Sequence, residues 1–308
     1  MIHVEHLTRK YGDFTAVDDV SFEIGPGEIV GLLGHNGAGK TTIMKMMTGY
    51  LEPTGGSISI DKLDIGKDRR KIQKKIGYLP ENCPVYLEMT IFDYLDYCAS
   101  LHGIAKKDRP ALIREAIRRT ALEEKAVKQI ATLSRGYRQR TGVAQAILHK
   151  PDILILDEPT NGLDPTQIQH MRTLIAELAE TATVIISTHI LQEVQAVCDR
   201  VIIIKDGAVA LDSRLEELWQ SSKLLISTDA ESGKAIELFS ALPQVASAVK
   251  SRAGQFTLEL NKEAGGDETA AAAARSIHEQ DWPLYSMHFE SRNLETVFAE
   301  ISEKGGAA

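Results

Sequence analysis

Gly34-His35-Asn36-Gly37-Ala38-Gly39-Lys40-Thr41 is the stretch from which the fold of this chain can be predicted. It matches the pattern of a phosphate-binding loop, in which a glycine and four further residues precede Gly-Lys-Thr. The apolar run 28–33 before it has the length of a buried strand, and residues 40–47 favour a helix that Gly49 ends. Strand, glycine-rich loop and helix form the context that this motif requires, so the sequence predicts an α/β fold around it.

The loop is suited to bind phosphate because its glycines let successive backbone N–H groups face an anion, next to the positive end of a helix dipole. Lys40 is expected to reach the β- and γ-phosphates of a nucleotide, and the Thr41 hydroxyl to bind Mg²⁺. The alternative is a strand-to-helix turn that binds nothing. The expected phosphate-binding residues are Gly34, Asn36, Gly37, Ala38, Gly39, Lys40, Thr41 and Thr42.

A second motif is the pair Asp157 and Glu158, which comes directly after the run of four apolar residues 153–156. Ligands of open α/β sheets bind at the carboxyl ends of the strands, where these two carboxylates are expected. Asp157 suits a Mg²⁺ role and Glu158 suits polarisation of an attacking water. Taken alone, the pair also fits a strand that runs into an acidic helix cap.

The whole chain has the composition of a soluble globular protein. Its 308 residues suit one large domain with a smaller one, and 43 % hydrophobic and 25 % charged residues are ordinary values. A net charge of −8 argues against nucleic acid as a partner. Three scattered cysteines argue against a disulfide framework or a zinc site. We expect no secretory signal and no membrane span, so another polypeptide would cross any membrane involved.

The sequence resembles the ATP-binding subunits of ABC transporters over residues 1 to about 215. Leu133-Ser134-Arg135-Gly136-Tyr137-Arg138-Gln139-Arg140 looks like the signature motif of that family. Asn161-Gly162-Leu163-Asp164 looks like its D-loop, and Ser187-Thr188-His189 like its switch-histidine segment. Tyr11 stands where the family places an aromatic residue under adenine.

The resemblance implies catalytic roles for Lys40, Glu158 and His189, with ATP and Mg²⁺ as the bound groups. His189 would hold the γ-phosphate and sense its loss. Ser134 and Gly136 would contact the γ-phosphate of ATP held by a second subunit. Nucleotide binding by Tyr11 and Asp164 and metal binding by Thr41, Glu81 and Asp157 complete the implied site. Two subunits, as a homodimer or with a homologous ATPase subunit, would close on two ATP molecules and reopen after hydrolysis.

Two departures from the family pattern stand out. Glu81 replaces the usual glutamine of the Q-loop, and we expect it to couple ATP binding more tightly to Mg²⁺, since a carboxylate binds this ion more strongly than an amide does. In the signature, Arg135 and Tyr137 replace the commoner glycine and glutamine, while Ser134 and Gly136 remain.

The predicted fold is a P-loop NTPase ABC nucleotide-binding domain over 1–215, plus a small C-terminal α+β domain. The first domain would combine a parallel-sheet core, an antiparallel β subdomain and a helical subdomain at about 86–150. Residues 216–308 alternate strands and helices in an order that resembles a ferredoxin-like accessory module.

The sequence variants resemble bacterial exporters of the gliding-motility, copper-processing and drug-efflux types. This implies a separate multi-span membrane subunit as partner, docked near 83–101, and a cytoplasmic location on the inner face of the cell membrane. A soluble ABC protein that acts on ribosomes or DNA is the main alternative, and a regulatory module without turnover is a third. The net negative charge argues against the first alternative, and the presence of Glu158 and His189 argues against the second.

Overall fold

The computed structural model describes residues 1–219, 223–252, 254–261, 266–290 and 294–303. The chain separates into two compact units. The first unit is Met1–Leu215, and it also includes the end of the last helix, from Ile301 onward. The second unit is Glu216–Glu300. The predicted accessory domain, 216–308, therefore differs at its end, and its residues 304–308 lie outside the described part of the chain.

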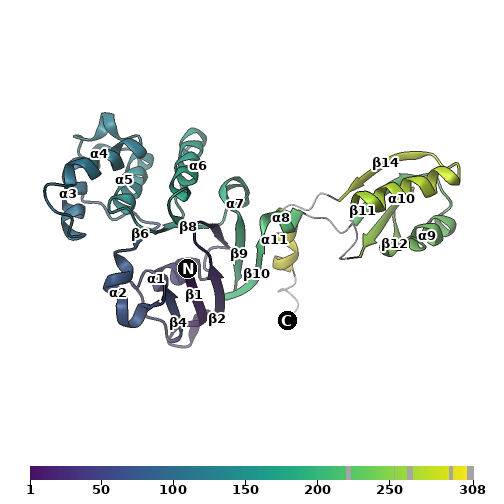
Figure 1. Cartoon of the computed structure of the whole chain (residues 1–308), viewed down its shortest axis with the longest axis horizontal. Helices are drawn as coiled ribbons and strands as arrows, with labels where there is room; N and C mark the ends of the chain where they lie inside the picture. The colour runs from purple at the N-terminus through teal and green to yellow at the C-terminus, as the bar shows by residue number, and fades with distance from the viewer. Residues whose placement is uncertain (220–222, 253, 262–265, 291–293, 304–308) are drawn as a thin grey trace. The chain divides into compact units, whose positions relative to one another are not determined.

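A six-stranded sheet forms the centre of the first unit, in the order β10-β9-β3-β8-β7-β6 (Figure 1). Its strands pair in parallel from β9 to β6, and β10 adds an antiparallel edge strand. Every residue of β7 and β8 is buried, which explains their unbroken apolar runs. The strands are β3 Ile29–Leu33, β6 Ile76–Leu79, β7 Ile153–Asp157, β8 Thr183–Thr188, β9 Arg200–Lys205 and β10 Ala208–Arg214.

A second, antiparallel sheet has the order β2-β1-β4-β5. Apolar side chains of its strands pack with those of the helix after the phosphate loop in one buried cluster. The strands are β1 Ile2–Tyr11, β2 Phe14–Ile24, β4 Gly55–Ile60 and β5 Leu63–Asp64.

Three helices form a lobe that follows β6 in the chain (Figure 1). Thr90 and Ser134 cap α3 and α5 by accepting hydrogen bonds from backbone N–H groups of the first turns. The lobe contains α3 Ile91–Leu101, α4 Arg109–Arg119 and α5 Arg135–Ile147, with 3₁₀ turns at Glu123–Lys125 and Ile130–Thr132. The remaining helices of this unit are α1 Lys40–Met47, α2 Ile65–Gln73, α6 Pro165–Ala179, α7 Leu191–Val197 and α8 Leu215–Trp219, which crosses its boundary.

The second unit has its own four-stranded antiparallel sheet, ordered β12-β13-β11-β14. This is the strand order of a ferredoxin-like βαββαβ module, as the sequence pattern predicts. Its elements are β11 Lys223–Thr228, α9 Ser232–Ser240, β12 Val245–Arg252, β13 Gln255–Leu260, α10 Gly266–Glu279 and β14 Leu284–Phe289, followed by α11 Leu294–Glu303.

The fold class is confirmed: a mixed, largely parallel sheet, an antiparallel sheet and a set of helices, with a further α+β unit. The helix α2 was not part of the sequence prediction. Within the described residues, no helix has the length and apolar character needed to cross a membrane.

Candidate nucleotide-binding site

The phosphate loop lies between the buried strand β3 and the first residue of α1. Gly39 has φ of 108°, and a side chain there would place its Cβ 2.7 Å from the carbonyl oxygen of Ala16. A Cβ on Gly34 would lie 2.3 Å from the carbonyl oxygen of Ile204. Glycine is therefore required at both positions, because neighbouring backbone leaves no room for a larger residue.

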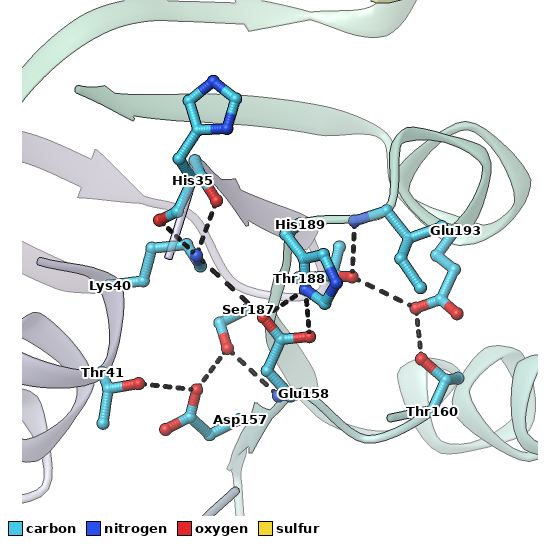
Figure 2. A network of polar contacts seen from close by, with 12 residues as sticks. His35, Lys40, Thr41, Asp157, Glu158, Thr160, Ser187, Thr188, His189 and Glu193 are labelled. Atoms are coloured by element: carbon cyan, nitrogen blue, oxygen red, sulfur yellow. Dashed lines mark hydrogen bonds and ion pairs between the residues drawn. The ribbon is translucent and has the colours of Figure 1, made fainter. Parts of the chain in front are cut away.

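Lys40 lies inside this loop with only 6 % of its surface exposed. Its Nζ donates hydrogen bonds to the carbonyl oxygens of Gly34 (2.6 Å) and His35 (3.1 Å), and lies 4.0 Å from Oε1 of Glu158 (Figure 2). Burial lowers the pKa of Lys40, and the negative charges of Glu158, Asp157 and Glu81 oppose that shift. The ammonium group is thus held against the backbone of the loop by two carbonyl oxygens.

Asp157 ends β7 and is fully buried. Its Oδ1 accepts hydrogen bonds from Thr41 (3.2 Å) and from the Ser187 hydroxyl (Figure 2). Its Oδ2 is also buried and has no hydrogen-bond partner among the described residues. A buried carboxylate oxygen without a partner, beside a threonine hydroxyl, is the donor set of a hard cation such as Mg²⁺.

The residues present fit a cation that takes its remaining ligands from water and from a nucleotide. Among the described residues, no cluster of three or more His, Cys, Asp or Glu side chains could hold a metal by itself. Mg²⁺ typically keeps several waters and is bound by one or two carboxylates with substrate phosphates. Thr41 and Asp157 meet that description. Glu81, the third predicted metal ligand, is exposed and lies along the rim of the same pocket.

Glu158 and His189 form the second half of the site. Nδ1 of His189 lies 3.0 Å from both carboxylate oxygens of Glu158, and Figure 2 shows the two side chains facing each other. The Glu158 backbone has φ of 49°, and its N–H donates to the carbonyl and hydroxyl oxygens of Ser187, each at 3.1 Å. Burial raises the pKa of Glu158, while His189 and Lys40 oppose that rise. A carboxylate with a raised pKa next to a histidine is suited to take a proton from water.

A buried carboxylate supports this pair. Glu193, on α7, accepts hydrogen bonds from the hydroxyls of Thr160 and Thr188. The Thr188 hydroxyl in turn accepts the N–H of Ile190 at 3.1 Å. Since Thr160 follows Glu158 and Thr188 precedes His189, Glu193 fixes the segments that carry both catalytic candidates.

These residues surround one pocket of about 530 Å³. Of the predicted site residues, Tyr11, Asn36, Gly37, Gly39, Lys40, Thr41, Thr42, Glu81, Glu158 and His189 line it. Gly34 and Ala38 belong to the phosphate loop but do not line the pocket. Asp157 is linked to the pocket by the hydrogen bond that it accepts from Thr41.

Sequence reasoning missed Phe14, Ala16 and Glu193, and it named Asn161 and Ser187 in motifs without giving either a role in the site. Phe14 pairs with Tyr11 across the β1–β2 turn, and both rings are exposed, by 63 % and 47 %. Arg9 covers one face of Tyr11, with 4.6 Å between the guanidinium carbon and the ring centroid. The Tyr11-Gly12-Asp13 turn signal would have identified Phe14, because a tight turn brings its flanking residues together.

The structure does not bring the signature residues to this pocket. Ser134 caps α5, and Asp164 caps α6 by accepting the N–H of Gln167 at 2.9 Å. Gly136 and Asp164 line a separate hollow of about 460 Å³. A Cβ on Gly136 would lie 2.4 Å from Oε1 of Gln167, so these two helix starts pack closely.

Comparison with known proteins places this chain in a large family. A family model described as ABC transporter matches residues 17–161. YxlF of Bacillus subtilis (strain 168), an uncharacterized ABC transporter ATP-binding protein, is 37 % identical over 84 % of this chain and 86 % of its own length. BcrA of Bacillus licheniformis, a bacitracin transport ATP-binding protein, is 38 % identical over 72 % of each chain.

Solved structures that resemble this chain belong to ABC transporter cassettes as well. The bacterial ABC transporter cassette MJ0796, solved as a dimer, is 26 % identical and superimposes with a TM-score of 0.65. The match covers 70 % of this chain and 99 % of that one. A post-hydrolysis state of the same cassette with ADP and Pi is 25 % identical, again with a TM-score of 0.65. This chain therefore belongs to the ABC transporter ATP-binding proteins, and its nucleotide-binding domain is an ABC ATPase domain.

Proposed function

We propose that this chain is the ATP-hydrolysing subunit of a membrane exporter, which two ATPase subunits drive by closing on ATP and reopening after hydrolysis. One observation carries the proposal most directly. The buried Glu158 carboxylate lies within hydrogen-bond distance of His189 and 4.0 Å from the ammonium group of Lys40. A base, its orienting histidine and a phosphate-binding cation are the groups that ATP hydrolysis requires.

The residues of the pocket then have defined tasks in hydrolysis. Lys40 and the backbone N–H groups of residues 34–42 bind the phosphates, and Tyr11 with Phe14 stacks on adenine. Thr41 and Asp157 would hold Mg²⁺, with Glu81 near it, and the ion would neutralise charge on the β- and γ-phosphates. Glu158 accepts the proton of the attacking water, and His189 holds Glu158 in place and contacts the γ-phosphate.

A second subunit supplies the groups that one subunit does not bring to its own pocket. Ser134 and Gly136 at the start of α5, with Asp164 at the start of α6, would meet the nucleotide of the partner. The dimeric state of the related cassette MJ0796 supports this arrangement. One set of motifs per chain is consistent with a homodimer or a pair of homologous subunits.

The membrane partner is proposed to dock on the segment between β6 and α3 and on α3 itself. Tyr86 and Leu87 are each 46 % exposed there, and Phe92 and Tyr97 are 39 % and 38 % exposed. Tyr86 also packs edge-on against Tyr97, with ring centroids 5.6 Å apart. A preformed group of exposed aromatic side chains suits a protein interface. The chain would thereby lie on the cytoplasmic face of the membrane.

The experiment is ATP turnover by the purified protein with Mg²⁺, alone and with its membrane partner. Lys40→Ala should abolish turnover, while Glu158→Gln should stop turnover and accumulate ATP-bound dimers. Lys67→Ala, a change of an exposed lysine on α2, is the matched control and should retain the parental rate. Turnover unchanged by Lys40→Ala, or purification with ribosomes or DNA rather than a multi-span protein, would refute the proposal.

A further inference from the structure

Arg9 packs its charge against an aromatic ring rather than against a carboxylate. It lies on β1, two residues before Tyr11, and is partly buried. Its guanidinium carbon lies 4.6 Å from the centroid of the Tyr11 ring, within the range of a cation–π interaction. Within the part of the chain that the structure describes, Arg9 forms no ion pair, so no carboxylate neutralises the charge that faces the ring.

The Arg9 side chain is held in place by one hydrogen bond besides this contact. Its Nη1 donates to the backbone carbonyl oxygen of Glu52 at 3.0 Å, while the carboxylate of Glu52 pairs with Arg69. Its Nε is buried and has no hydrogen-bond partner among the described residues. Burial of an N–H group without a partner costs free energy. The contact with Tyr11 is therefore the interaction that offsets this cost.

Tyr11 keeps one face for a ligand. Its ring is 47 % exposed although Arg9 covers one face, and Tyr11 lines the nucleotide pocket whereas Arg9 does not. A cation on one face draws the π-electrons of the ring toward itself, so the opposite face carries less negative charge and attracts the π-system of a purine more strongly. The same contact restricts rotation of the ring, so less side-chain freedom is lost when a base stacks on it.

We propose that Arg9 is a positioning residue for the nucleotide base, which acts through Tyr11 by fixing and polarising its ring. This inference rests on the proposed function, in which Tyr11 stacks on adenine. Arg9 touches no residue that binds phosphate or activates water, so its contribution concerns the base alone. It raises the affinity for nucleotides over that for inorganic phosphates and leaves the hydrolytic step unchanged.

The test uses isothermal titration calorimetry of the full chain with two probes, Mg²⁺-ADP and Mg²⁺-pyrophosphate. Pyrophosphate carries two linked phosphates without a base. Arg9→Ala should raise the dissociation constant of ADP by about 3- to 10-fold, the combined effect of losing a cation–π contact and a fixed ring. The dissociation constant of pyrophosphate should not change. In steady-state turnover, KM for ATP should rise by the same factor while kcat stays at the parental value.

Further variants separate the charge of Arg9 from its hydrogen bond. Arg9→Lys keeps a cation and should retain most of the ADP affinity, whereas Arg9→Gln keeps an N–H donor for the Glu52 carbonyl without the charge and should behave like Arg9→Ala. In a Tyr11→Ala protein, Arg9→Ala should have no additional effect. Lys10→Ala is the matched control, because it removes an exposed charge from the next residue of β1 and should leave both dissociation constants unchanged.

The outcomes are distinct. Unchanged ADP affinity in Arg9→Gln would overturn the inference, as would an equal loss for ADP and pyrophosphate or a loss that persists in the Tyr11→Ala protein. Each of these results leaves ATP turnover, and with it the proposed function, intact. A Tyr11→Ala protein that binds ADP as tightly as the parent would contradict the proposed stacking on adenine, and the inference with it. A parental protein that binds no ADP would contradict the proposed function itself.

Discussion

At the scale of single residues, Glu158 combines a left-handed backbone with a buried carboxylate. Burial raises its pKa, so the ionised form that exists at neutral pH costs folding free energy. Glu158→Gln should therefore raise the melting temperature at neutral pH. The gain should shrink as the pH falls through the raised pKa of Glu158, because the parental carboxyl then becomes neutral as well. Circular dichroism melts of both proteins over this pH range measure the difference.

Glu124→Gln serves as the reference, since Glu124 is exposed in a 3₁₀ turn away from the pocket. Its melting temperature should match that of the parent across the same range. A Glu158→Gln protein that melts below its parent at neutral pH would show that His189 and Lys40 stabilise the charge by more than burial costs. That result would contradict the direction of the pKa shift.

The predicted site residues depended on short local patterns, and the missed ones depend on pairing between strands. Asp157 and Glu158 follow an apolar strand in the sequence, so their place at its end could be inferred directly. Ser187 lies on another strand, opposite Asp157 in the β7–β8 register. Sequence spacing alone does not specify which strands are neighbours, so the hydrogen bond between these residues could not be predicted.

At the scale of elements, β6 and α5 approach each other closely at one glycine. A Cβ on Gly77 would lie 2.2 Å from the carbonyl oxygen of Ala146 and 2.8 Å from a methyl group of Leu154. The first of these contacts is with backbone, so a change of rotamer cannot relieve it. Gly77→Ala should separate α5 from β6 and cost about 1–3 kcal/mol of stability, as overpacked cores do. Denaturant unfolding of the parent and the variant measures this cost.

Because α5 carries the signature and β6 leads to Glu81, Gly77→Ala should also lower ATP turnover. Gly55→Ala is the control, since Gly55 also lies in a strand and its added Cβ would meet nothing closer than Thr8 Cβ at 3.7 Å. Equal unfolding midpoints for the two variants would show that the β6–α5 contact adjusts without cost.

Element boundaries could be predicted where a cap or a turn marks them. Asp164 followed by proline is such a signal, and α6 begins there with Asp164 as its cap. The helix α2 was not predicted because its sequence is mostly charged and only Ile65 and Ile72 are buried. Two apolar residues are too few to show the periodicity of an amphipathic helix. The start of α5 is harder to infer from sequence, because glycine at the second helical residue disfavours a helix although the Ser134 cap begins one there.

At the scale of the whole molecule, the two compact units have separate hydrophobic cores. The order of strands and helices was enough to predict a ferredoxin-like second unit. The assignment of the end of α11, from Ile301 to Glu303, to the first unit was not predictable, because it depends on a contact between residues far apart in sequence. Nζ of Lys205 donates to the carbonyl oxygen of Ile301 at 2.6 Å.

Separate cores predict two unfolding transitions in calorimetry, of which nucleotide should shift only one. All residues of the proposed ATP pocket belong to Met1–Leu215. In the Glu158→Gln protein, Mg²⁺-ATP at 100 times its dissociation constant should add about 2.7 kcal/mol to the unit that binds it. The transition of Glu216–Glu300 should stay at its original temperature.

Phe239→Ala identifies the second transition. Phe239 is fully buried, with its ring centroid 5.8 Å from that of Phe256, and its removal should cost that unit about 3–5 kcal/mol. The nucleotide-sensitive transition should be unaffected, because neither phenylalanine belongs to the cores of the first unit. A single transition whose melting temperature is raised by nucleotide and lowered by Phe239→Ala would contradict this prediction. The two units would then unfold cooperatively, and the second would have to be regarded as an integral part of the ATPase.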